Sequence, residues 1–220
     1  MVLCDNEGGF KSHHVIPFWR YHSMEYVNAL KARRSVYAIG NAALVPDEEL
    51  QSLIGEIIEA SPSAFNSQSQ RTVLLLGTKH EELWKITLEA LRKIVPEKQF
   101  PKTEAKIKSF AAGHGTLLFF DETAITEALI RDYPLYKDNF PVWAQQQAGI
   151  LQGNVWTALS TLGYGASLQH YNELVESQVK AVFGFPNSWK LLAQMPFGNV
   201  LKAPGAKEFE PLGTKFKVLK

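Results

Sequence analysis

Two arginines and a serine stand next to one another early in the chain, as Arg33, Arg34 and Ser35, and Tyr37 follows closely. A guanidinium group presents a planar fork of N–H donors that matches phosphate oxygens, and a hydroxyl adds another hydrogen bond. These residues are therefore candidates for holding a phosphate. The alternative is a solvated helix end, where cations complement the helix dipole and bind no ligand. Spacing alone favours this second interpretation.

A polar loop over residues 61–70 is rich in amides, with Asn66, Gln68 and Gln70 placed among serines. An amide offers both donors and an acceptor, which suits a flat heterocycle whose edge alternates carbonyl and N–H groups. Taken alone, the loop is more typical of a surface connection whose amides cap the neighbouring backbone. The sequence leaves both interpretations open.

Gln147 and Asn154 lie seven residues apart, so they share one face of a helix predicted over residues 143–162. Buried amides need hydrogen-bond partners. A ligand, a facing subunit and neighbouring loops are three sources of such partners, and the sequence does not choose among them.

Residues 163–172 combine small residues with a polar and aromatic end, in the order Gly-Tyr-Gly-Ala-Ser-Leu-Gln-His-Tyr-Asn. Small residues allow a ligand to approach the backbone. His170 is a candidate for proton transfer, although a lone histidine is more often structural. Lys207 follows a turn-rich Pro-Gly-Ala segment and is a candidate for a second phosphate contact, although a solvated lysine is the commoner case.

Familiar catalytic motifs are missing from the sequence. It contains neither a dinucleotide-binding nor a Walker-type glycine loop, and the Cys-x-x-Cys, His-Glu-x-x-His and Gly-x-Ser-x-Gly patterns do not occur. The N-terminal histidines His13, His14 and His22 fit no metal-ligand spacing. The sequence therefore favours neither a metal site nor a serine nucleophile.

Composition limits the class of protein further. The chain has 220 residues, 45% of them hydrophobic, and a formal net charge of +1, so no overall field attracts nucleic acid or an anionic membrane. The single cysteine, Cys4, excludes an internal disulfide and favours a reducing, cytoplasmic compartment. The longest uncharged run, residues 139–172, carries several glutamines, which indicates a helix buried in a core or between subunits and not a membrane span.

These residues must be positioned by the elements around them. Hydrophobic periodicity predicts helices over residues 24–34, 47–58, 80–95, 102–112, 122–131, 143–162 and 173–183. Apolar runs predict strands over residues 72–77, 116–120, 166–168, 191–196 and 216–219. The alternation of helices and strands indicates an α/β domain with a parallel sheet. Residues 1–23 are interpreted as an N-terminal arm or leader, and residues 24–220 as one domain.

Over about residues 24–220 the chain resembles nitroreductase-like flavoproteins, and in particular the branch with the bacterial copper-induced nitroreductase and the yeast fatty-acid-repression proteins. The resemblance rests on four segments in the family's order. They are Arg33-Arg34-Ser35, Pro62-Ser63-Ala64-Phe65-Asn66-Ser67-Gln68-Ser69, Gly165-Ala166-Ser167-Leu168-Gln169-His170-Tyr171-Asn172 and Met195-Pro196-Phe197-Gly198.

This resemblance implies an α+β fold with a central, mainly antiparallel sheet surrounded by helices, in an intertwined homodimer with FMN at the subunit interface. The long uncharged helix would lie in the dimer core. By motif, the residues implied to contact the FMN phosphate and ribityl chain are Arg33, Arg34, Ser35, Tyr37 and Lys207. Those implied to contact the flavin ring or its surroundings are Asn66, Gln68, Gln147, Ser167, Leu168, Gln169 and His170.

The resemblance also implies an oxidoreductase that takes a hydride from NAD(P)H onto the flavin and then reduces a nitroaromatic or quinone in the same slot. A flavin performs this redox chemistry while the protein binds and orients it, which agrees with the missing nucleophile motifs. His170 is the candidate catalytic residue, as a proton donor. The alternative function is a flavin-sequestering or regulatory protein in stress or lipid signalling, with little turnover, since a fold does not fix a function.

Overall fold

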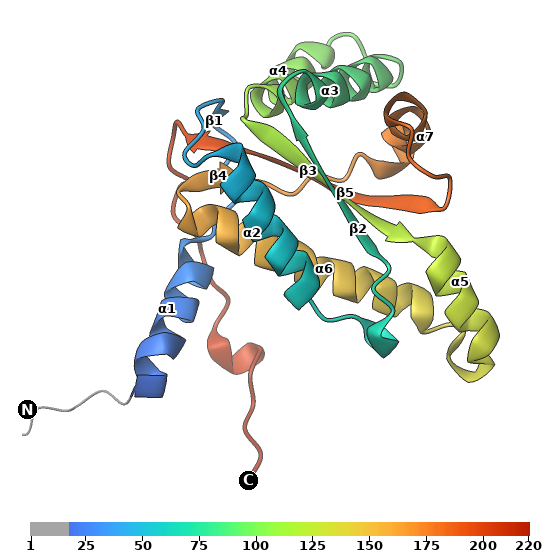
Figure 1. Ribbon diagram of the computed structural model, residues 1–220. Coiled ribbons are helices and arrows are strands. Elements are labelled where there is room, and N and C mark those ends of the chain that lie inside the picture. The colour runs from blue at the N-terminus through green and yellow to red at the C-terminus, as the bar shows by residue number, and fades with distance from the viewer. Residues whose placement is uncertain (1–17) are drawn as a thin grey trace, which may run out of the picture.

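The computed structural model describes residues 18–220, with side chains described from Met24 onward (Figure 1). A five-stranded sheet lies in the middle of the domain, with helices on both of its faces. The order across the sheet is β1-β5-β3-β2, and β4 also pairs with β5. The strands are β1 (Ile39–Gly40), β2 (Gln70–Leu76), β3 (Gly115–Glu122), β4 (Tyr164–Ala166) and β5 (Trp189–Val200).

All strand pairs of the sheet are antiparallel, which confirms the α+β fold that the family resemblance implied. The parallel sheet inferred from alternation is wrong, and the connection between β2 and β3 shows why. Two helices packed on each other, α3 (Gly77–Arg92) and α4 (Phe100–Ala111), carry the chain away and back, so that Leu76 pairs with Gly115. Alternation reveals that helices intervene, but not the end of the sheet to which the chain returns.

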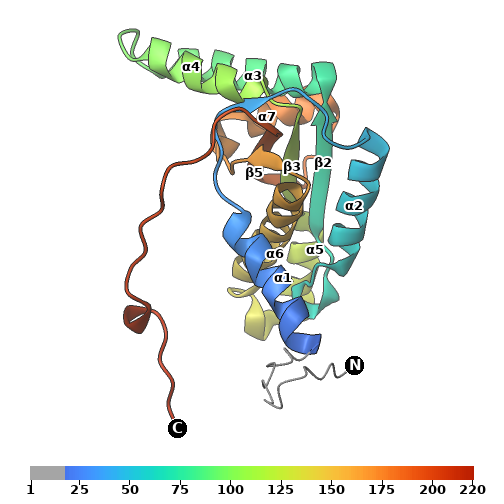
Figure 2. The ribbon, with the colours of Figure 1, turned by 90° about the vertical axis from the view of Figure 1, so that its left-hand side faces the viewer.

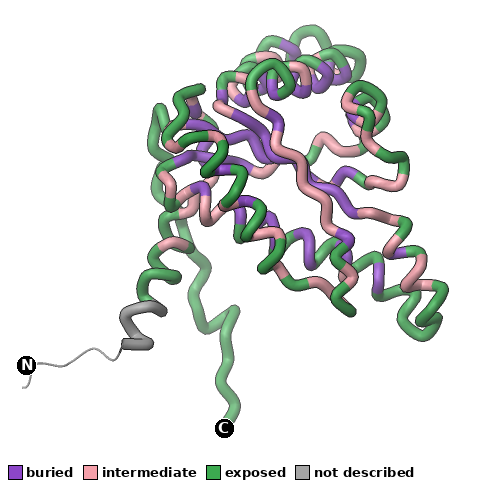
Figure 3. The backbone as a smooth tube through the Cα atoms, in the orientation of Figure 1, coloured by how far each residue is buried: buried purple, intermediate pink, exposed green. Residues whose placement is uncertain are grey.

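The core lies on both faces of the sheet because β3 is buried along almost its whole length. Successive side chains of a strand point to opposite faces. Leu118 and Phe120 therefore pack in a cluster with α3, α4 and α7 (Asn172–Phe183), while Leu117 and Phe119 pack in a second cluster with α2 (Asp47–Ala60) and α6 (Phe140–Thr161). Figure 3 shows this buried centre between the exposed outer faces of the helices.

The second cluster contains the helices on which the site depends. Helix α2 has acidic residues in its first turn, where they complement the helix dipole, and it buries Leu50 and Ile54. Helix α6 is uncharged, as predicted, and buries Leu151, Val155 and Leu159 against the sheet. Its opposite side leaves Ile150 46% exposed, so this helix has apolar residues on both sides.

The remaining helices agree with the sequence predictions to within a few residues, apart from the first. Helix α5 spans Thr123–Asp132, and short 3-10 turns lie at η1 (Ala64–Asn66), η2 (Pro134–Tyr136) and η3 (Leu212–Thr214). Helix α1 spans Phe18–Ala32, so it begins inside the predicted N-terminal arm. The arm's residues 1–17, with His13 and His14, lie outside the described residues, and so does the side chain of His22.

The strand predicted over residues 216–219 is wrong. Residues 201–220 are all exposed, and beyond β5 they contain only the turn η3. Figures 1 and 2 show this tail running away from the domain on the same side as α1. An apolar run becomes a strand only when a sheet edge is available to pair with it, and the tail meets no edge within the described residues. Its exposed apolar side chains include Phe209, Leu212, Phe216 and Leu219.

The described residues show no features of a membrane span or of a metal site. Among residues 18–220, no helix has the length and hydropathy needed to cross a membrane. The same part of the chain holds no group of three or more His, Cys, Asp or Glu side chains placed to bind a metal ion.

Candidate functional site

The segment that follows α1 runs beside β4, which joins two of the predicted motifs. Ser35 forms a parallel bridge with Ala166, and the Val36 N–H donates to the Ala166 carbonyl at 2.9 Å. Gly165 makes this contact sterically feasible, since a Cβ there would lie 2.7 Å from Val36 Cγ1. The small residues predicted to admit a ligand therefore admit, at Gly165, a neighbouring segment of the chain.

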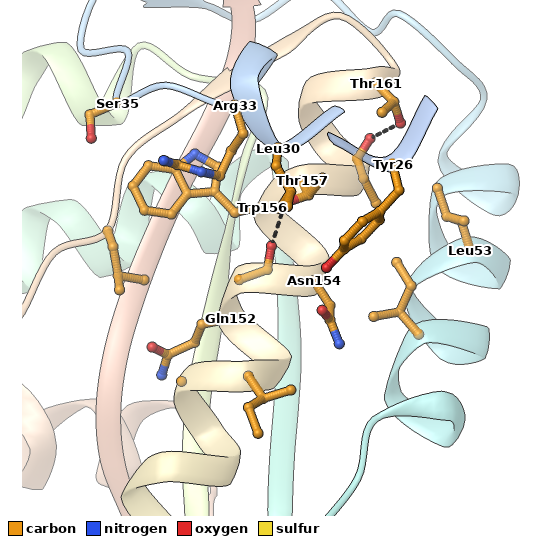
Figure 4. A pocket seen from close by; sticks show the side chains of 16 residues that line it. Tyr26, Leu30, Arg33, Ser35, Leu53, Gln152, Asn154, Trp156, Thr157 and Thr161 are labelled. Carbon is orange, nitrogen blue, oxygen red and sulfur yellow. Dashed lines mark hydrogen bonds between the residues drawn. The ribbon is translucent and has the colours of Figure 1, made fainter. Parts of the chain in front are cut away.

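Arg33 lies against α6 and faces a large cavity. Its guanidinium stands 4.4 Å from the centre of the Trp156 ring, a cation–π contact (Figure 4). The cavity has a volume of about 970 Å³ and is lined by α1, α2 and α6, with Ser35 and Leu168 also in its wall. Arg33, Ser35, Leu168 and Trp156 are called the arginine cluster below.

Trp156 is the residue of this cavity that sequence reasoning missed. Its Nε1–H is buried and has no hydrogen-bond partner among the described residues. Buried donors are normally satisfied, so this N–H is a polar atom whose partner the described residues do not supply. The cavity thus combines a cation, a hydroxyl and apolar surface, which fits a ligand with an anionic group and a flat apolar body. The sequence shows a tryptophan in an uncharged helix, but it does not show that this tryptophan lies beside Arg33.

The C-terminal segment reaches the same end of the molecule through Arg34. Its Nη2 donates to the Gly205 carbonyl at 2.8 Å, which brings residues 204–207 beside the segment after α1. Lys207 is exposed, and its Nζ lies 5.1 Å from the centre of the Phe209 ring. Tyr37 lies outside the cavity wall, with its ring centre 6.4 Å from that of Phe110 in α4.

The segment after β4 divides its side chains between the interior and two cavities. Ser167 and Gln169 are buried and bonded to each other, with Gln169 Nε2 donating to Ser167 Oγ at 3.0 Å. Leu168 faces the large cavity, whereas exposed His170 lines a separate cavity of about 250 Å³. Gln152 of α6 lines both cavities. The segment therefore runs between the two spaces, with alternate residues buried.

The amide-rich loop, here called the amide loop and comprising residues 62–69, has a strained backbone. Phe65, Asn66 and Gln68 have φ values of 55°, 50° and 49°, in the left-handed region that non-glycine residues rarely adopt. Such strain costs about 1–3 kcal/mol per residue and concentrates at functional sites. The side chains of Asn66 and Gln68 are exposed and make no hydrogen bond within the described part of the chain. They are free to meet a ligand or another subunit.

Neighbouring loops supply the partners of Gln147, one of the three alternatives left by the sequence. Gln147 is 5% exposed; its Oε1 accepts from the Ala64 N–H at 3.0 Å, and its Nε2 donates to Ser69 Oγ at 2.8 Å. Asn154 lies on the same side of α6 but is exposed, lines the large cavity, and donates to Ser61 Oγ at 3.2 Å. One helix face thus carries a buried structural amide and an accessible one.

Most of the predicted site residues form two groups, whereas Tyr37 and His170 lie outside both. Gln147, beneath the amide loop, and Trp156, beneath Arg33, are nine residues apart on α6. At a rise of 1.5 Å per residue they are separated by about 14 Å along the helix axis. Figure 1 shows the loop after α2 and the segment after α1 towards opposite ends of α6. A single chain therefore does not unite all the residues that the resemblance assigned to FMN.

The structure thus combines an antiparallel sheet, covered by helices, with a large cavity beside the arginine cluster, and sequence comparison names the family of this fold. The family model described as Nitroreductase family matches residues 30–199. The chain belongs to the nitroreductase family, whose typical cofactor is FMN. This confirms the predicted family, and FMN as its typical cofactor.

Individual relatives come from both branches that the sequence resembled. The Saccharomyces cerevisiae protein HBN1 is 35% identical over 188 residues, which cover 84% of this chain and 92% of HBN1. The yeast nitroreductase FRM2 is 32% identical over 186 residues, with the same shares covered. The structure of nitroreductase CinD from Lactococcus lactis is similar with a TM-score of 0.82 and 39% identity, over 89% of this chain and all 100% of CinD.

Proposed function

We propose that this protein is an FMN-dependent oxidoreductase that transfers electrons from NAD(P)H to nitroaromatic or quinone acceptors by a ping-pong mechanism. The observation that carries the proposal is the arginine cluster in a nitroreductase fold, with Arg33, Ser35 and Trp156 in the wall of one cavity. Membership of the family supports an oxidoreductase in general terms. A nitroreductase of similar fold has been solved with bound FMN.

The residues of this chain would bind and orient the cofactor. Arg33 and Ser35 would hold the phosphate, because they place a guanidinium and a hydroxyl in the cavity wall. Arg34 would act by holding residues 204–207, and with them Lys207, near that phosphate. Leu168 would pack on the flavin face, with the backbone of Ser167 and Gln169 beside it. When bound, FMN supplies the hydride and electron-transfer chemistry that no side chain of this chain can.

The acceptor and the reductant are proposed from the relatives. CinD has been solved in complex with chloramphenicol and with 4-nitrophenol, both nitroaromatics, and with nicotinic acid, which resembles the ring of the nicotinamide cofactors. A flat slot that receives the reductant and the acceptor in turn needs no second site, which is the basis of the ping-pong order. His170 would supply a proton from the neighbouring cavity; unchanged reduction by His170→Ala across the pH range would exclude that role.

A homodimer would complete the site. Because the amide loop and the arginine cluster lie about 14 Å apart along α6, a two-fold axis near the middle of α6 would bring the loop of one chain to the cluster of its partner. Apolar side chains exposed on α1, on α6 and in the tail would supply the interface; they include Tyr26, Leu30, Val142, Ile150, Phe209 and Phe216. Their burial on association follows from the cost of leaving such area in water.

We also propose a compartment for the protein and a second candidate function. The single cysteine supports a cytoplasmic location. The second candidate, a flavin-sequestering or regulatory protein of stress or lipid signalling, is favoured by the position of His170 outside the large cavity, which leaves no ionisable proton donor from the segment after β4 in its wall.

One experiment separates these functions. The visible spectrum of the purified protein is recorded, and NADH or NADPH is then added without oxygen. Flavin bands that bleach and return on addition of 4-nitrophenol or a quinone support the oxidoreductase. Bands that do not bleach support the sequestering protein. A colourless protein that takes up no added FMN excludes both, and light scattering of the same sample tests the dimer.

A further inference from the structure

The strained amide loop is held from below by a chain of buried hydrogen bonds. Gln147 contacts the Ala64 N–H and Ser69 Oγ, as described above, and the Ser69 hydroxyl in turn lies 2.5 Å from Asp121 Oδ1. The second carboxylate oxygen, Asp121 Oδ2, accepts from Thr126 Oγ1 at 3.0 Å. The chain therefore links the loop to α6, to the end of β3 and to α5.

The four side chains of this hydrogen-bond chain are buried. The exposed fractions are 1% for Ser69, 6% for Asp121, 8% for Thr126 and 5% for Gln147. Breaking one of these bonds leaves an unsatisfied polar atom at a buried position. These bonds therefore restrain the conformation of the amide loop.

Asp121 receives its hydrogen bonds from hydroxyl groups. Lys190 is its neighbour across β3 and β5, and both side chains line a cavity of about 190 Å³. Lys190 is exposed, however, and forms no ion pair with Asp121 within the described range of the chain. A buried carboxylate is costly unless it is paired or hydrogen-bonded, so the hydroxyl donors of Ser69 and Thr126 are what stabilise Asp121 here.

The charge on Asp121 also fixes the direction of these hydrogen bonds. An ionised carboxylate only accepts, so Ser69 must give its one proton to Asp121 and accept from the amide of Gln147. That orientation turns Gln147 Oε1 towards the Ala64 N–H, the first backbone group ahead of Phe65. The charge on Asp121 therefore favours, through Ser69, the same amide orientation that the Ala64 N–H requires at the left-handed turn.

We infer that Asp121 is a positioning residue for flavin binding: acting through Ser69 and Gln147, it holds the amide loop in the strained conformation that presents Asn66 and Gln68. This inference rests on the proposed function for the identity of the ligand, but not for the ordering of the loop. An asparagine at position 121 donates as well as accepts, so it removes the fixed direction while keeping the size of the side chain.

The test compares Asp121→Asn with Glu127→Gln, which removes the same charge from the same cavity but has no part in the hydrogen-bond chain. Hydrogen–deuterium exchange of residues 62–69 is measured in the apoprotein, and FMN affinity by titration of the apoprotein. We expect about tenfold faster exchange in the loop and about tenfold weaker FMN binding in Asp121→Asn, because one charge-assisted hydrogen bond is lost. Glu127→Gln should match the wild type in both.

A second pair of variants distinguishes loss of the hydrogen-bond chain from misfolding. Ser69→Ala cuts the chain in its middle, while Ser69→Thr keeps the hydroxyl and should restore both exchange and affinity towards wild-type values. Loop exchange in Asp121→Asn and Ser69→Ala that equals the wild type would overturn the inference, and so would FMN affinity within twofold of it. If the wild type binds no FMN, the proposed function fails, and the loop exchange alone then decides whether Asp121 orders the loop.

Discussion

The two ends of helix α6 present polar groups in different ways. At the Trp156 end, the arginine cluster faces an open cavity, and the Arg33 guanidinium stacks on an aromatic ring. At the Gln147 end, the amide loop is strained and is fixed by buried hydrogen bonds. The first end offers charge on an adaptable side chain, and the second offers a preorganised backbone.

The difference matters because a ligand gains affinity from each end in a different manner. A guanidinium contributes through charge, which acts over several ångströms and tolerates small displacements. A preset loop contributes by avoiding the entropy cost of becoming ordered on binding. A site built from both would combine anion recognition with shape selection, and the following experiments test that division from the largest expected effect to the smallest.

Removal of the Arg33 charge should have the largest effect on FMN affinity. Arg33→Ala should weaken FMN binding by about 10- to 100-fold, because hydrogen bonds to a charged group are worth more than neutral ones. Arg33→Lys should retain part of the affinity, since it keeps the charge but not the fork. Equilibrium titration of apoprotein measures both. Arg131→Ala, at an exposed position on α5, is the matched control, and an equal loss in it would show that only the overall charge matters.

Mixing two defective chains tests whether the ends act within one chain or between two. Arg33→Ala and Gln68→Ala chains are co-expressed with different tags, and the mixed dimers are isolated. If each site combines the cluster of one chain with the loop of its partner, a mixed dimer has one of its two sites intact, and it should bind one FMN with wild-type affinity. If each chain forms its own site, every site carries one defect and no tight binding returns.

Relaxing the strain at the loop should separate stability from binding. Asn66→Gly places at φ 50° a residue that adopts this region readily. The gain from relieved strain and the loss from greater freedom of the unfolded chain oppose each other, so the unfolding free energy should change by less than about 1 kcal/mol. FMN affinity should still fall, because the amide is gone. Chemical denaturation and FMN titration give the two values; a large loss of stability would show that Asn66 has a structural role.

The smallest effect is expected on the other face of the sheet, at His80, and only on stability. His80 Nε2 lies 3.2 Å from the Ala111 carbonyl, which can only accept, so Nε2 carries the proton and Nδ1 accepts from the Thr116 hydroxyl at 2.8 Å. Trp84 Nε1 also donates to that hydroxyl oxygen. Burial lowers the pKa of His80 below the ordinary value of 6.5, so the folded state disfavours its charged form.

The sign of the pH effect follows from that shift. Below pH 6.5 the unfolded chain binds a proton at position 80 before the folded chain does, so stability is lost as the pH falls from 6.5 towards the lowered pKa. His80→Gln should flatten this part of the stability–pH curve and leave FMN affinity unchanged. Urea denaturation between pH 5 and pH 8 measures it. An altered FMN affinity would show that the two faces of the sheet are coupled.

Local sequence pattern was sufficient for most of the individual elements. The stripe of Leu50, Ile54 and their neighbours placed α2, and the apolar run 116–120 placed β3, because these patterns depend on residues within one or two turns of each other. The pattern failed at the two-residue strand β1, which is too short to have a period, and at residues 216–219, where apolar residues meet no sheet edge.

The sequence by itself determined the family, the uncharged character of α6 and the residue types available for binding an anion and a flat ring. The tertiary structure decided how these residues are distributed. It showed that the chain returns to the same end of the sheet after β2, that Trp156 lies under Arg33, and that Asp121 and Ser69 support the amide loop. These relations join residues far apart in the chain, and only the packing of the helices on the sheet brings them together.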